Sequence, residues 1–283
     1  MNRLAGKCVV ITGGGRGIGR AMALANAAAG AHVVVVARTA TEVEATAQAV
    51  RDEGGAATAV TLDVLDLRAV EAAFARIALE VGPIDILINN AGVFSAIGPI
   101  WEVDPDSWWR DVEVSVRGTF NTCRAVLPSM RARRSGRIIN LIGGGTGGNF
   151  PMGSGYASAK SGIMRLTECV AATVRDDGIT VMAMAPGLVR TAMTEWQLTS
   201  PEGRKYLGVV AQRFAEGDNL PPERAAELSV EIGAGRFDAL TGRAVSAYDD
   251  FDAVAARMDE YVANDCRVLR MPGFGPTLKP LNE

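Results

Sequence analysis

The stretch Thr12-Gly-Gly-Gly-Arg-Gly-Ile-Gly19 decides the fold of this chain. It follows the short apolar run at residues 7–12, which predicts a strand, and leads into residues 17–29, which predict a helix. Small residues at such a junction let backbone amides approach a phosphate, and the N-terminus of the helix supplies partial positive charge. The glycines are spaced Gly-x3-Gly-x-Gly rather than in the common Gly-x-Gly-x2-Gly pattern. The turn is therefore suited to the pyrophosphate of a dinucleotide.

Outward from this turn, strand-like and helix-like runs alternate along the chain. Residues 32–37 are almost all valine, which suits a parallel strand buried on both faces. Such alternation implies right-handed crossovers and an α/β fold with a doubly wound sheet. The predicted strands are 7–12, 32–37, 57–62, 84–89, 137–142, 179–183 and 243–247, and the predicted helices are 17–29, 41–53, 67–81, 104–133, 156–176 and 222–232.

Length and composition limit the class of protein. The chain has 283 residues, a net charge of -3 and 48% hydrophobic residues. No linker appears, so one large domain is favoured over two small ones. The near-neutral charge argues against nucleic acid as a partner. No apolar run of 18 or more residues predicts a membrane span, and no apolar signal-peptide core precedes the first strand. We expect a cytoplasmic protein.

The alternating pattern stops near Asp249, which predicts a catalytic domain at residues 1–248 and a C-terminal extension at 249–283. Residues 251–262 could form an amphipathic helix. Residues 267–283 contain three prolines and predict an extended tail. This tail could cover the active-site mouth, reach a neighbouring subunit or lie on its own surface.

The cysteines and the single histidine argue against metal chemistry. Cys8, Cys123, Cys169 and Cys266 form no CxxC pair, and we expect buried, reduced thiols. His32 begins a predicted strand and is expected to be structural. With one histidine and scattered cysteines, no metal site is predicted. No GxSxG turn precedes a helix, which argues against a serine hydrolase.

Tyr156 and Lys160 lie four residues apart in Gly155-Tyr-Ala-Ser-Ala-Lys160. Four residues make about one helical turn, so both side chains project from the same helix face. A free tyrosine has a pKa of about 10. An ammonium ~5 Å away, at an effective dielectric constant of ~20, favours the phenolate by roughly 3 kcal/mol, or about two pKa units. We therefore expect Tyr156 to exchange a proton with a substrate hydroxyl or carbonyl beside a hydride carrier.

Four motifs in this order resemble the short-chain dehydrogenase/reductase family. They are Thr12–Gly19, Asn89-Asn-Ala-Gly92, Tyr156-x3-Lys160 and Pro186-Gly-Leu-Val-Arg-Thr191, and the resemblance covers roughly residues 5–248. It implies a mainly parallel, seven-stranded, Rossmann-like sheet with helices on both faces. It also implies a nicotinamide cofactor and a homodimer or homotetramer built through the long helices at 104–133 and 156–176.

The resemblance also implies which residues bind the cofactor. Asp63 and Val64 would flank the adenine. Lys160 would hydrogen-bond the nicotinamide ribose, and Val189 and Thr191 would touch the carboxamide. The full predicted cofactor-binding set is Gly13, Gly15, Arg16, Gly17, Ile18, Gly19, Arg38, Asp63, Val64, Asn90, Ala91, Gly92, Tyr156, Lys160, Pro186, Gly187, Val189 and Thr191.

The end of the second predicted strand indicates which nicotinamide cofactor binds. An acidic residue there accepts a hydrogen bond from the ribose and repels a 2′-phosphate. This chain has Ala37-Arg38-Thr39 instead, without a carboxylate. Arg38 can pair with a phosphate as a planar fork, and Arg16 adds a second positive charge. NADP(H) is therefore favoured over NAD(H).

Two positions depart from the family pattern. Gly143 stands thirteen residues before Tyr156, where the family has a serine that binds the reacting oxygen. Thr146, Ser154 or the backbone amides of residues 143–145 could replace that donor, or the substrate could carry its own polar group. Ser115 stands where the family has an asparagine that holds a water in the proton path. The predicted catalytic residues are therefore Tyr156, Lys160 and Ser115.

Two functions stay open. The first is an NADP(H)-dependent oxidoreductase that interconverts an alcohol and a carbonyl. The second, motivated by the two departures, is a non-redox cyclase, dehydratase or isomerase, or a sensor, that keeps the cofactor fold. Residues 193–220 predict a mobile lid. An apolar cavity for a small, apolar or aromatic substrate is predicted from Phe94, Phe150, Met152, Met193, Trp196 and Phe214.

Overall fold

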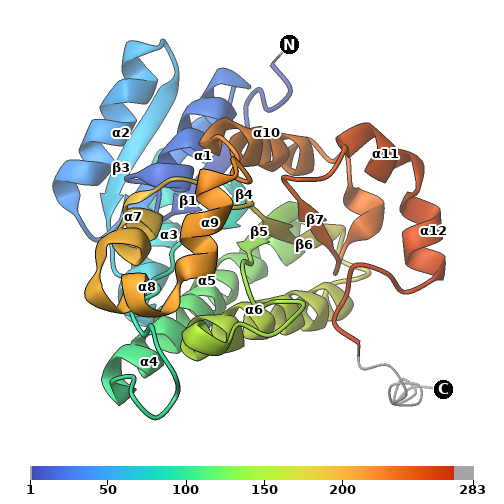
Figure 1. Ribbon diagram of the computed structural model, residues 1–283. Helices are drawn as coiled ribbons and strands as arrows, with labels where there is room; N and C mark the ends of the chain where they lie inside the picture. Colours follow the sequence, from blue (N-terminus) through green and yellow to red (C-terminus); the bar gives the residue numbers. More distant parts are fainter. Residues whose placement is uncertain (1, 271–283) are drawn as a thin grey trace.

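A parallel sheet forms the centre of the protein, and helices cover both of its faces (Figure 1). The computed structural model describes residues 2–270. Within them the sheet has seven strands in the order β3-β2-β1-β4-β5-β6-β7, which confirms the predicted doubly wound α/β fold. The strands are β1 (Cys8–Thr12), β2 (His32–Ala37), β3 (Ala56–Thr61), β4 (Ile84–Asn89), β5 (Gly136–Leu141), β6 (Ile179–Ala185) and β7 (Ala244–Ser246).

The helices alternate with the strands until β6, after which several short ones follow (Figure 1). The described α-helices are α1 (Gly17–Ala28), α2 (Ala40–Asp52), α3 (Leu67–Glu80), α4 (Pro105–Val112), α5 (Gly118–Arg133), α6 (Ser154–Thr173), α7 (Ala192–Thr199), α8 (Pro201–Tyr206), α9 (Gly208–Ala215), α10 (Pro222–Gly233), α11 (Phe251–Ala256) and α12 (Met258–Ala263). The other turns of helix are η1 (Glu113–Arg117), η2 (Pro151–Gly153) and η3 (Asp238–Leu240).

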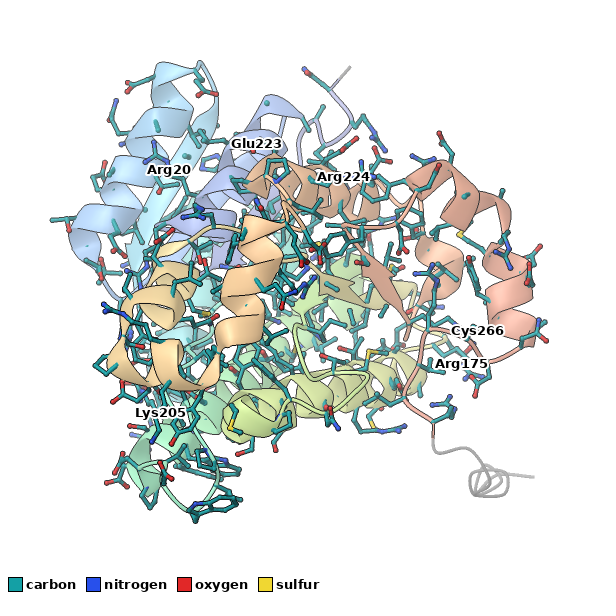
Figure 2. All side chains as sticks on the ribbon, in the orientation of Figure 1. Arg20, Arg175, Lys205, Glu223, Arg224 and Cys266 are labelled. Atoms are coloured by element: carbon teal, nitrogen blue, oxygen red, sulfur yellow. The ribbon has the colours of Figure 1, made fainter. Side chains whose placement is uncertain are left out.

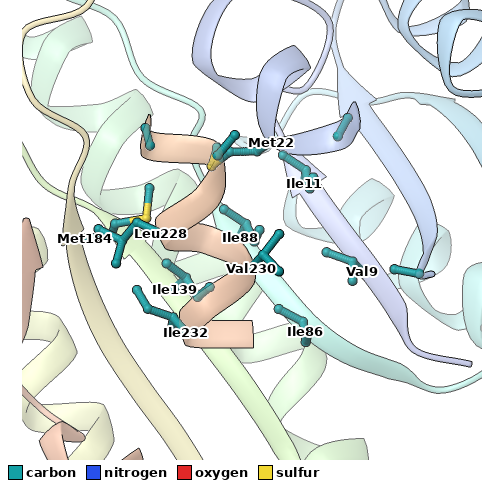
Figure 3. Close-up of a cluster of buried hydrophobic side chains, with 14 of the residues drawn as sticks. Val9, Ile11, Met22, Ile86, Ile88, Ile139, Met184, Leu228, Val230 and Ile232 are labelled. Carbon is teal, nitrogen blue, oxygen red and sulfur yellow. The ribbon is translucent and has the colours of Figure 1, made fainter. Parts of the chain in front are cut away.

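Side chains that alternate along each strand build a core on both faces of the sheet. Val9 and Ile11 of β1 join the cluster beneath α1 and α10, whereas Val10 joins the cluster on the opposite face. Figure 3 shows α10 laid across the sheet, with Leu228 and Ile232 among the strand isoleucines. Each fully buried aliphatic side chain stabilises the fold by roughly 1.5–3 kcal/mol. A one-residue slip of β1 would exchange its two faces, so the register is strongly specified.

The strand order reverses beside β1, because β2 lies on one side of it and β4 on the other. The chain crosses over one face of the sheet on its way to β2 and β3, and over the opposite face after β4. Connections that leave in opposite directions open a crevice at the carboxyl ends of the two central strands. The glycine turn after β1 and the Asn89-Asn90 pair at the end of β4 therefore meet at this crevice.

The helix predicted at residues 104–133 is divided in the structure. The segment η1, between α4 and α5, is a π-helix with Ser115 at its centre. Such single-turn π-helices occur often at functional sites. Similarly, the helix predicted at 251–262 is interrupted at Arg257, between α11 and α12. The lid predicted at 193–220 contains all but the first residue of α7, and the whole of α8 and α9.

The expectation that the cysteines are buried was correct for two of the four. Cys8 and Cys123 are buried, and burial raises the pKa of both thiols to about 12. Cys169 and Cys266 are exposed. Cys169 lies in an apolar run of the sequence, but α6 buries only the side chains that recur at helical spacing on its sheet-facing side.

Residues 249–270 cover the end of the sheet beyond β7 (Figure 1). The backbone N–H of Ala244 in β7 donates to the carbonyl of Arg267 at 3.0 Å. Phe251 and Val254 of α11 are buried in the main core cluster. The rest of the predicted tail, residues 271–283, lies outside the described residues. Within residues 2–270, no helix combines the length and apolar character that crossing a bilayer requires.

Candidate active site

The glycine turn has a backbone path that side chains would obstruct. Gly13 and Gly17 have φ angles of +62° and +53°, in the left-handed region that glycine adopts at little cost. A Cβ on Gly19 would lie 2.1 Å from the carbonyl oxygen of Gly13. The first turn of α1 therefore packs directly against the loop that precedes it, and its free N–H groups open onto the crevice.

Asn90 braces this turn from the neighbouring strand. Its side-chain amide donates to the carbonyl oxygens of Thr12 and Gly13, both at 3.0 Å. The backbone N–H groups of Asn90 and Ala91 donate to Thr12 Oγ1, both at 3.1 Å. The motif after β4 was predicted to line a cofactor; it does line the cleft, and it also fixes the shape of the glycine turn.

A cleft of about 260 Å³ runs along the carboxyl ends of the central strands. It begins at the glycine turn, passes the ends of β2 and β3 and reaches the start of α7. The predicted cofactor-binding residues that line it are Gly13, Gly15, Arg16, Gly17, Ile18, Gly19, Arg38, Asp63, Val64, Asn90, Ala91, Gly92 and Thr191. The narrow glycine approach and two arginines fit a phosphate-bearing dinucleotide.

The remaining predicted residues lie outside the walls of this cleft. Val189 is buried and forms an isolated parallel bridge with Leu220. Pro186 and Gly187 precede it, at the end of β6, and Gly187 packs against Leu220. Thr191 is the only member of that motif to line the cleft, and its methyl group lies 3.3 Å from the position of a Cβ on Gly17.

One carboxylate at the adenosine end of the cleft was missed from the sequence. Glu42, in the first turn of α2, lines the cleft with Arg38 and Thr39. It forms an ion pair with Arg16 at 3.5 Å. Arg38 is exposed and forms no ion pair with another residue in the range 2–270. The sequence prediction rested on Ala37-Arg38-Thr39, and Glu42 lies three residues beyond Thr39, in the first turn of α2.

Tyr156 and Lys160 meet as their spacing predicted, but their electrostatics differ from the prediction. Lys160 Nζ lies 5.4 Å from the centre of the Tyr156 ring and donates to the carbonyl oxygen of Leu141 at 2.9 Å. Burial raises the pKa of Tyr156 to about 12, and the negative charge of Asp111 acts in the same direction. Burial lowers the pKa of Lys160 to about 8. For the side chains of the protein alone, the predicted acidic phenol is therefore wrong, because burial outweighs the neighbouring ammonium.

Ser115 lies where the cleft approaches this pair. Its side chain is fully buried, and its Oγ has no hydrogen-bond partner among the described residues. A Cβ on Gly92 would lie 3.6 Å from Ser115 Oγ and 3.5 Å from Lys160 Nζ. Gly92 lines the cleft, so the two polar atoms flank the end of the cleft nearest the predicted acid–base pair.

Gly143 leaves a space that the phenol fills. A Cβ on Gly143 would lie 2.5 Å from the hydroxyl oxygen of Tyr156. Of the donors considered as replacements for the missing serine, Thr146 Oγ1 already donates to the Gly143 carbonyl at 2.7 Å. Ser154 Oγ accepts from Trp108 Nε1 at 3.0 Å. Neither hydroxyl is placed beside the phenol by these bonds.

An apolar cluster surrounds the ring of Tyr156 on the side of the lid. Of the side chains predicted to form a cavity, only Trp196 lies outside the cluster, and it is 40% exposed. The lid is tied to the opposite wall at Glu102, which accepts from the Tyr206 hydroxyl and pairs with Lys205 at 3.4 Å. Lys205 is labelled in Figure 2. The cluster contains Phe94, Ile97, Phe150, Met152, Tyr156, Leu188, Met193, Leu198, Tyr206, Leu207, Val210 and Phe214.

Known proteins resemble this chain in sequence. Residues 7–201 match the short chain dehydrogenase family. Oxidoreductase UcpA of Escherichia coli is 37% identical over 247 residues, which span 86% of this chain and 93% of that protein. A short chain dehydrogenase of Pseudocercospora fijiensis is 36% identical over 193 residues, 68% of this chain but only 62% of its relative.

Solved structures are also similar in fold and sequence. A gluconate 5-dehydrogenase from Burkholderia cenocepacia, in complex with NADP and tartrate, has a TM-score of 0.78 and 31% sequence identity. The match covers 87% of this chain and 94% of that one.

Proposed function

The chain belongs to the short chain dehydrogenase family, and from that premise we propose that it is an NADP(H)-dependent oxidoreductase that interconverts an alcohol and a carbonyl. Membership makes it an NAD(P)-dependent dehydrogenase that acts on a small molecule. One observation carries the finer proposal: the cleft that begins at the glycine turn is also lined by Gly92, beside Lys160 and Ser115. A bound nicotinamide cofactor supplies or accepts the hydride.

The glycine turn and the N-terminus of α1 bind the pyrophosphate, and Arg38 with Arg16 binds the 2′-phosphate of NADP(H). Three observations support this preference. Arg38 lines the cleft, Glu42 is partly neutralised by Arg16, and the gluconate 5-dehydrogenase of similar fold binds NADP. A guanidinium recognises a phosphate through two parallel hydrogen bonds, so Arg38 discriminates between the two cofactors more strongly than a lysine would.

Tyr156 moves the proton at its hydroxyl oxygen. Since burial raises the pKa of Tyr156 to about 12, the phenol stays protonated near neutral pH. In that form it donates to the oxygen of a carbonyl, so the side chains of this protein favour reduction. Lys160, anchored on the Leu141 carbonyl, orients the nicotinamide ribose and keeps positive charge beside the ring. Ser115 Oγ supplies a further hydroxyl beside Lys160 in the proton path.

The apolar cluster around Tyr156 supports a small, apolar or aromatic substrate. We expect NADPH absorbance to fall steadily with some members of a panel of apolar ketones and aldehydes. Tyr156→Phe should lower kcat by about 10²-fold to 10⁴-fold, the usual contribution of a proton donor. The dissociation constant for NADPH should change little, because Tyr156 does not line the cleft. Unchanged turnover in this variant would remove Tyr156 from the mechanism.

Gly143 supports one alternative function. The usual side-chain donor for the reacting oxygen is missing, and the phenol occupies its space. Loss of one such donor costs on the order of 3 kcal/mol in transition-state stabilisation. A cyclase, dehydratase or isomerase that keeps the cofactor fold would tolerate that loss. A protein that binds NADPH and transforms a substrate without consuming NADPH would establish this alternative and contradict the oxidoreductase.

We also propose that the protein is a homodimer or homotetramer that associates through α5 and α6. Phe120 of α5 is 47% exposed, so an apolar side chain on this helix is available to a partner chain. Light scattering at micromolar concentration should give a mass of two or four chains, and Phe120→Lys should reduce it. A monomeric mass for the natural sequence would contradict this proposal.

A further inference from the structure

A buried carboxylate fixes the loop that follows β4. Asp111 of α4 is fully buried. It accepts from the backbone N–H of Ser95 at 2.7 Å, from the Ser95 hydroxyl at 2.6 Å and from the backbone N–H of Ala96 at 3.1 Å. Burying a charge is costly unless hydrogen bonds compensate it. The three donors compensate Asp111 and in turn hold the backbone of residues 95–96 against α4.

This loop carries Phe94, and Phe94 packs on the phenol of Tyr156. The two rings are stacked, with centroids 4.8 Å apart and planes inclined by 24°. Phe94 is 5% exposed, and its other neighbour, Phe150, meets it edge-on at 5.6 Å. The ring also presses against Gly153, where a Cβ would lie 2.7 Å from Phe94 Cζ. Phe94 therefore has little freedom to move away from Tyr156.

No side chain limits the position of the phenol on the side of residue 143. At residue 143 there is no side chain, and the Tyr156 hydroxyl occupies the space where one would begin. Because residue 143 contributes no side chain, the stacked ring of Phe94 is the side-chain contact that limits movement of the phenol. The location of the Tyr156 hydroxyl is therefore set by Phe94 and, through the loop, by Asp111.

We propose that Phe94 and Asp111 are positioning residues for proton transfer: Asp111 fixes residues 95–96, and Phe94, carried by that loop, holds the Tyr156 phenol over Gly143. This inference rests on the proposed function, in which Tyr156 moves the proton. The charged groups nearest the phenol are Lys160 on its own helix and Asp111 on α4. The paired charges of the surrounding lid, Arg190 with Glu195 and Lys205 with Glu102, lie at its exposed surface.

The first test compares two substitutions of the same kind. Phe94→Leu keeps an apolar side chain but loses the stacked ring, and Phe74→Leu makes the same change in the core beneath α3, away from the site. We expect Phe94→Leu to lower kcat on the order of 10-fold to 100-fold, as a misplaced catalytic group does, with KM changed less than about threefold. Phe74→Leu should leave kcat unchanged. An effect of Phe94→Leu on KM alone would overturn the proposal, because Phe94 would then only contact substrate.

The second test measures the ionisation of Tyr156 directly and does not require enzymatic turnover. Ultraviolet absorbance reports tyrosine ionisation, and subtraction of the Tyr156→Phe curve isolates Tyr156 from the other tyrosines. Asp111→Asn removes a negative charge and loosens the loop, so Tyr156 should ionise at lower pH. Ser95→Ala removes only one of the three hydrogen bonds and should shift the midpoint less. An unchanged midpoint in Asp111→Asn would overturn the proposal.

The two tests separate this inference from the proposed function. If no alcohol or carbonyl is turned over, the proposed oxidoreductase fails, while the titration of Asp111→Asn still decides whether this side of the site places the phenol. If Phe94→Leu does not fold, the Asp111→Asn midpoint decides alone. If turnover is found but neither variant changes kcat or the midpoint, the oxidoreductase stands and the positioning role is rejected.

Discussion

The hydroxyl oxygen of Tyr156 lies 2.5 Å from the point at which a Cβ on Gly143 would lie. The glycine therefore does more than omit a donor, because it makes room for the phenol. Two expectations compete at this position. A serine could restore the missing hydrogen bond to the substrate, or it could push the phenol away from its neighbours. The short distance favours the second.

Substitution at Gly143 should reduce activity. We expect Gly143→Ala to lower kcat on the order of 10-fold to 100-fold, because the methyl group displaces the phenol. Gly143→Ser should lower it too, and any recovery relative to the alanine variant measures the value of the added hydroxyl. Steady-state NADPH consumption tests both. Turnover above that of the natural sequence in Gly143→Ser would show that a missing donor, and not space, limits the enzyme.

A methyl group at Gly19 should disrupt cofactor binding. It would lie 2.1 Å from the Gly13 carbonyl oxygen, an overlap that backbone movement must relieve. Overpacking of this kind costs typically 1–3 kcal/mol, so NADPH should bind on the order of 10-fold to 100-fold more weakly in Gly19→Ala. Gly147→Ala is the matched control, since a Cβ there meets nothing within 4 Å. Fluorescence titration with NADPH gives both dissociation constants, and equal values would contradict the packing of the turn.

Arg38 should decide between the two nicotinamide cofactors. A hydrogen bond to a charged group contributes about 1.5–3 kcal/mol, so Arg38→Ala should weaken NADPH binding by about 10-fold to 100-fold. NADH binding should change little, because NADH lacks the 2′-phosphate. Arg20→Ala, on the exposed side of α1 (Figure 2), is the control. A similar loss of affinity for both cofactors would show that Arg38 does not recognise the 2′-phosphate.

Stability should depend on pH through Lys160. Burial lowers the folded-state pKa of Lys160 from the model-compound value of 10.5 to about 8. Between pH 8 and 10.5 the unfolded chain therefore binds more protons at this residue than the folded chain. Stability consequently rises with pH across that window, by up to about 3 kcal/mol. Below pH 8 the full cost of the buried charge is present.

Urea unfolding of the natural sequence and of Lys160→Met measures this dependence. The free-energy difference between the two should move in favour of the natural sequence as pH rises from 8 to 10 and stay constant between pH 6 and 7. Tyr156 has the opposite effect on stability between about pH 10 and pH 12. In that range the folded chain binds more protons at this residue than the unfolded chain, so stability falls as pH rises. A difference that does not change with pH would mean that Lys160 is hydrated in the folded protein.

The fold could be predicted because its signals are local. The valine run of β2 and the glycine turn after β1 each identify an element without knowledge of the rest of the chain. The π-helical segment around Ser115 could not be predicted, because it interrupts an otherwise regular helical pattern. The helices of the lid are short and depend on caps, such as Thr191 at the start of α7 and Ser200 at the start of α8.

The site was predictable where its residues share one motif and not where they meet only in space. Tyr156 and Lys160 were found from their spacing. Asp111 and Glu42 were missed, because each acts on a segment distant from its own in sequence. The direction of the Tyr156 pKa shift was wrong for a related reason. Sequence spacing gives the distance to a neighbouring charge, but it gives no measure of burial, and burial is the larger effect here.

The hydrogen bond from Ala244 to Arg267 and the burial of Phe251 and Val254 limit where this protein can be shortened. A chain that ends at residue 248 would leave the edge strand β7 without its covering segment and would expose apolar surface beside it. Both changes promote aggregation. A shortened or fused version made for expression should therefore keep the chain intact through Arg267.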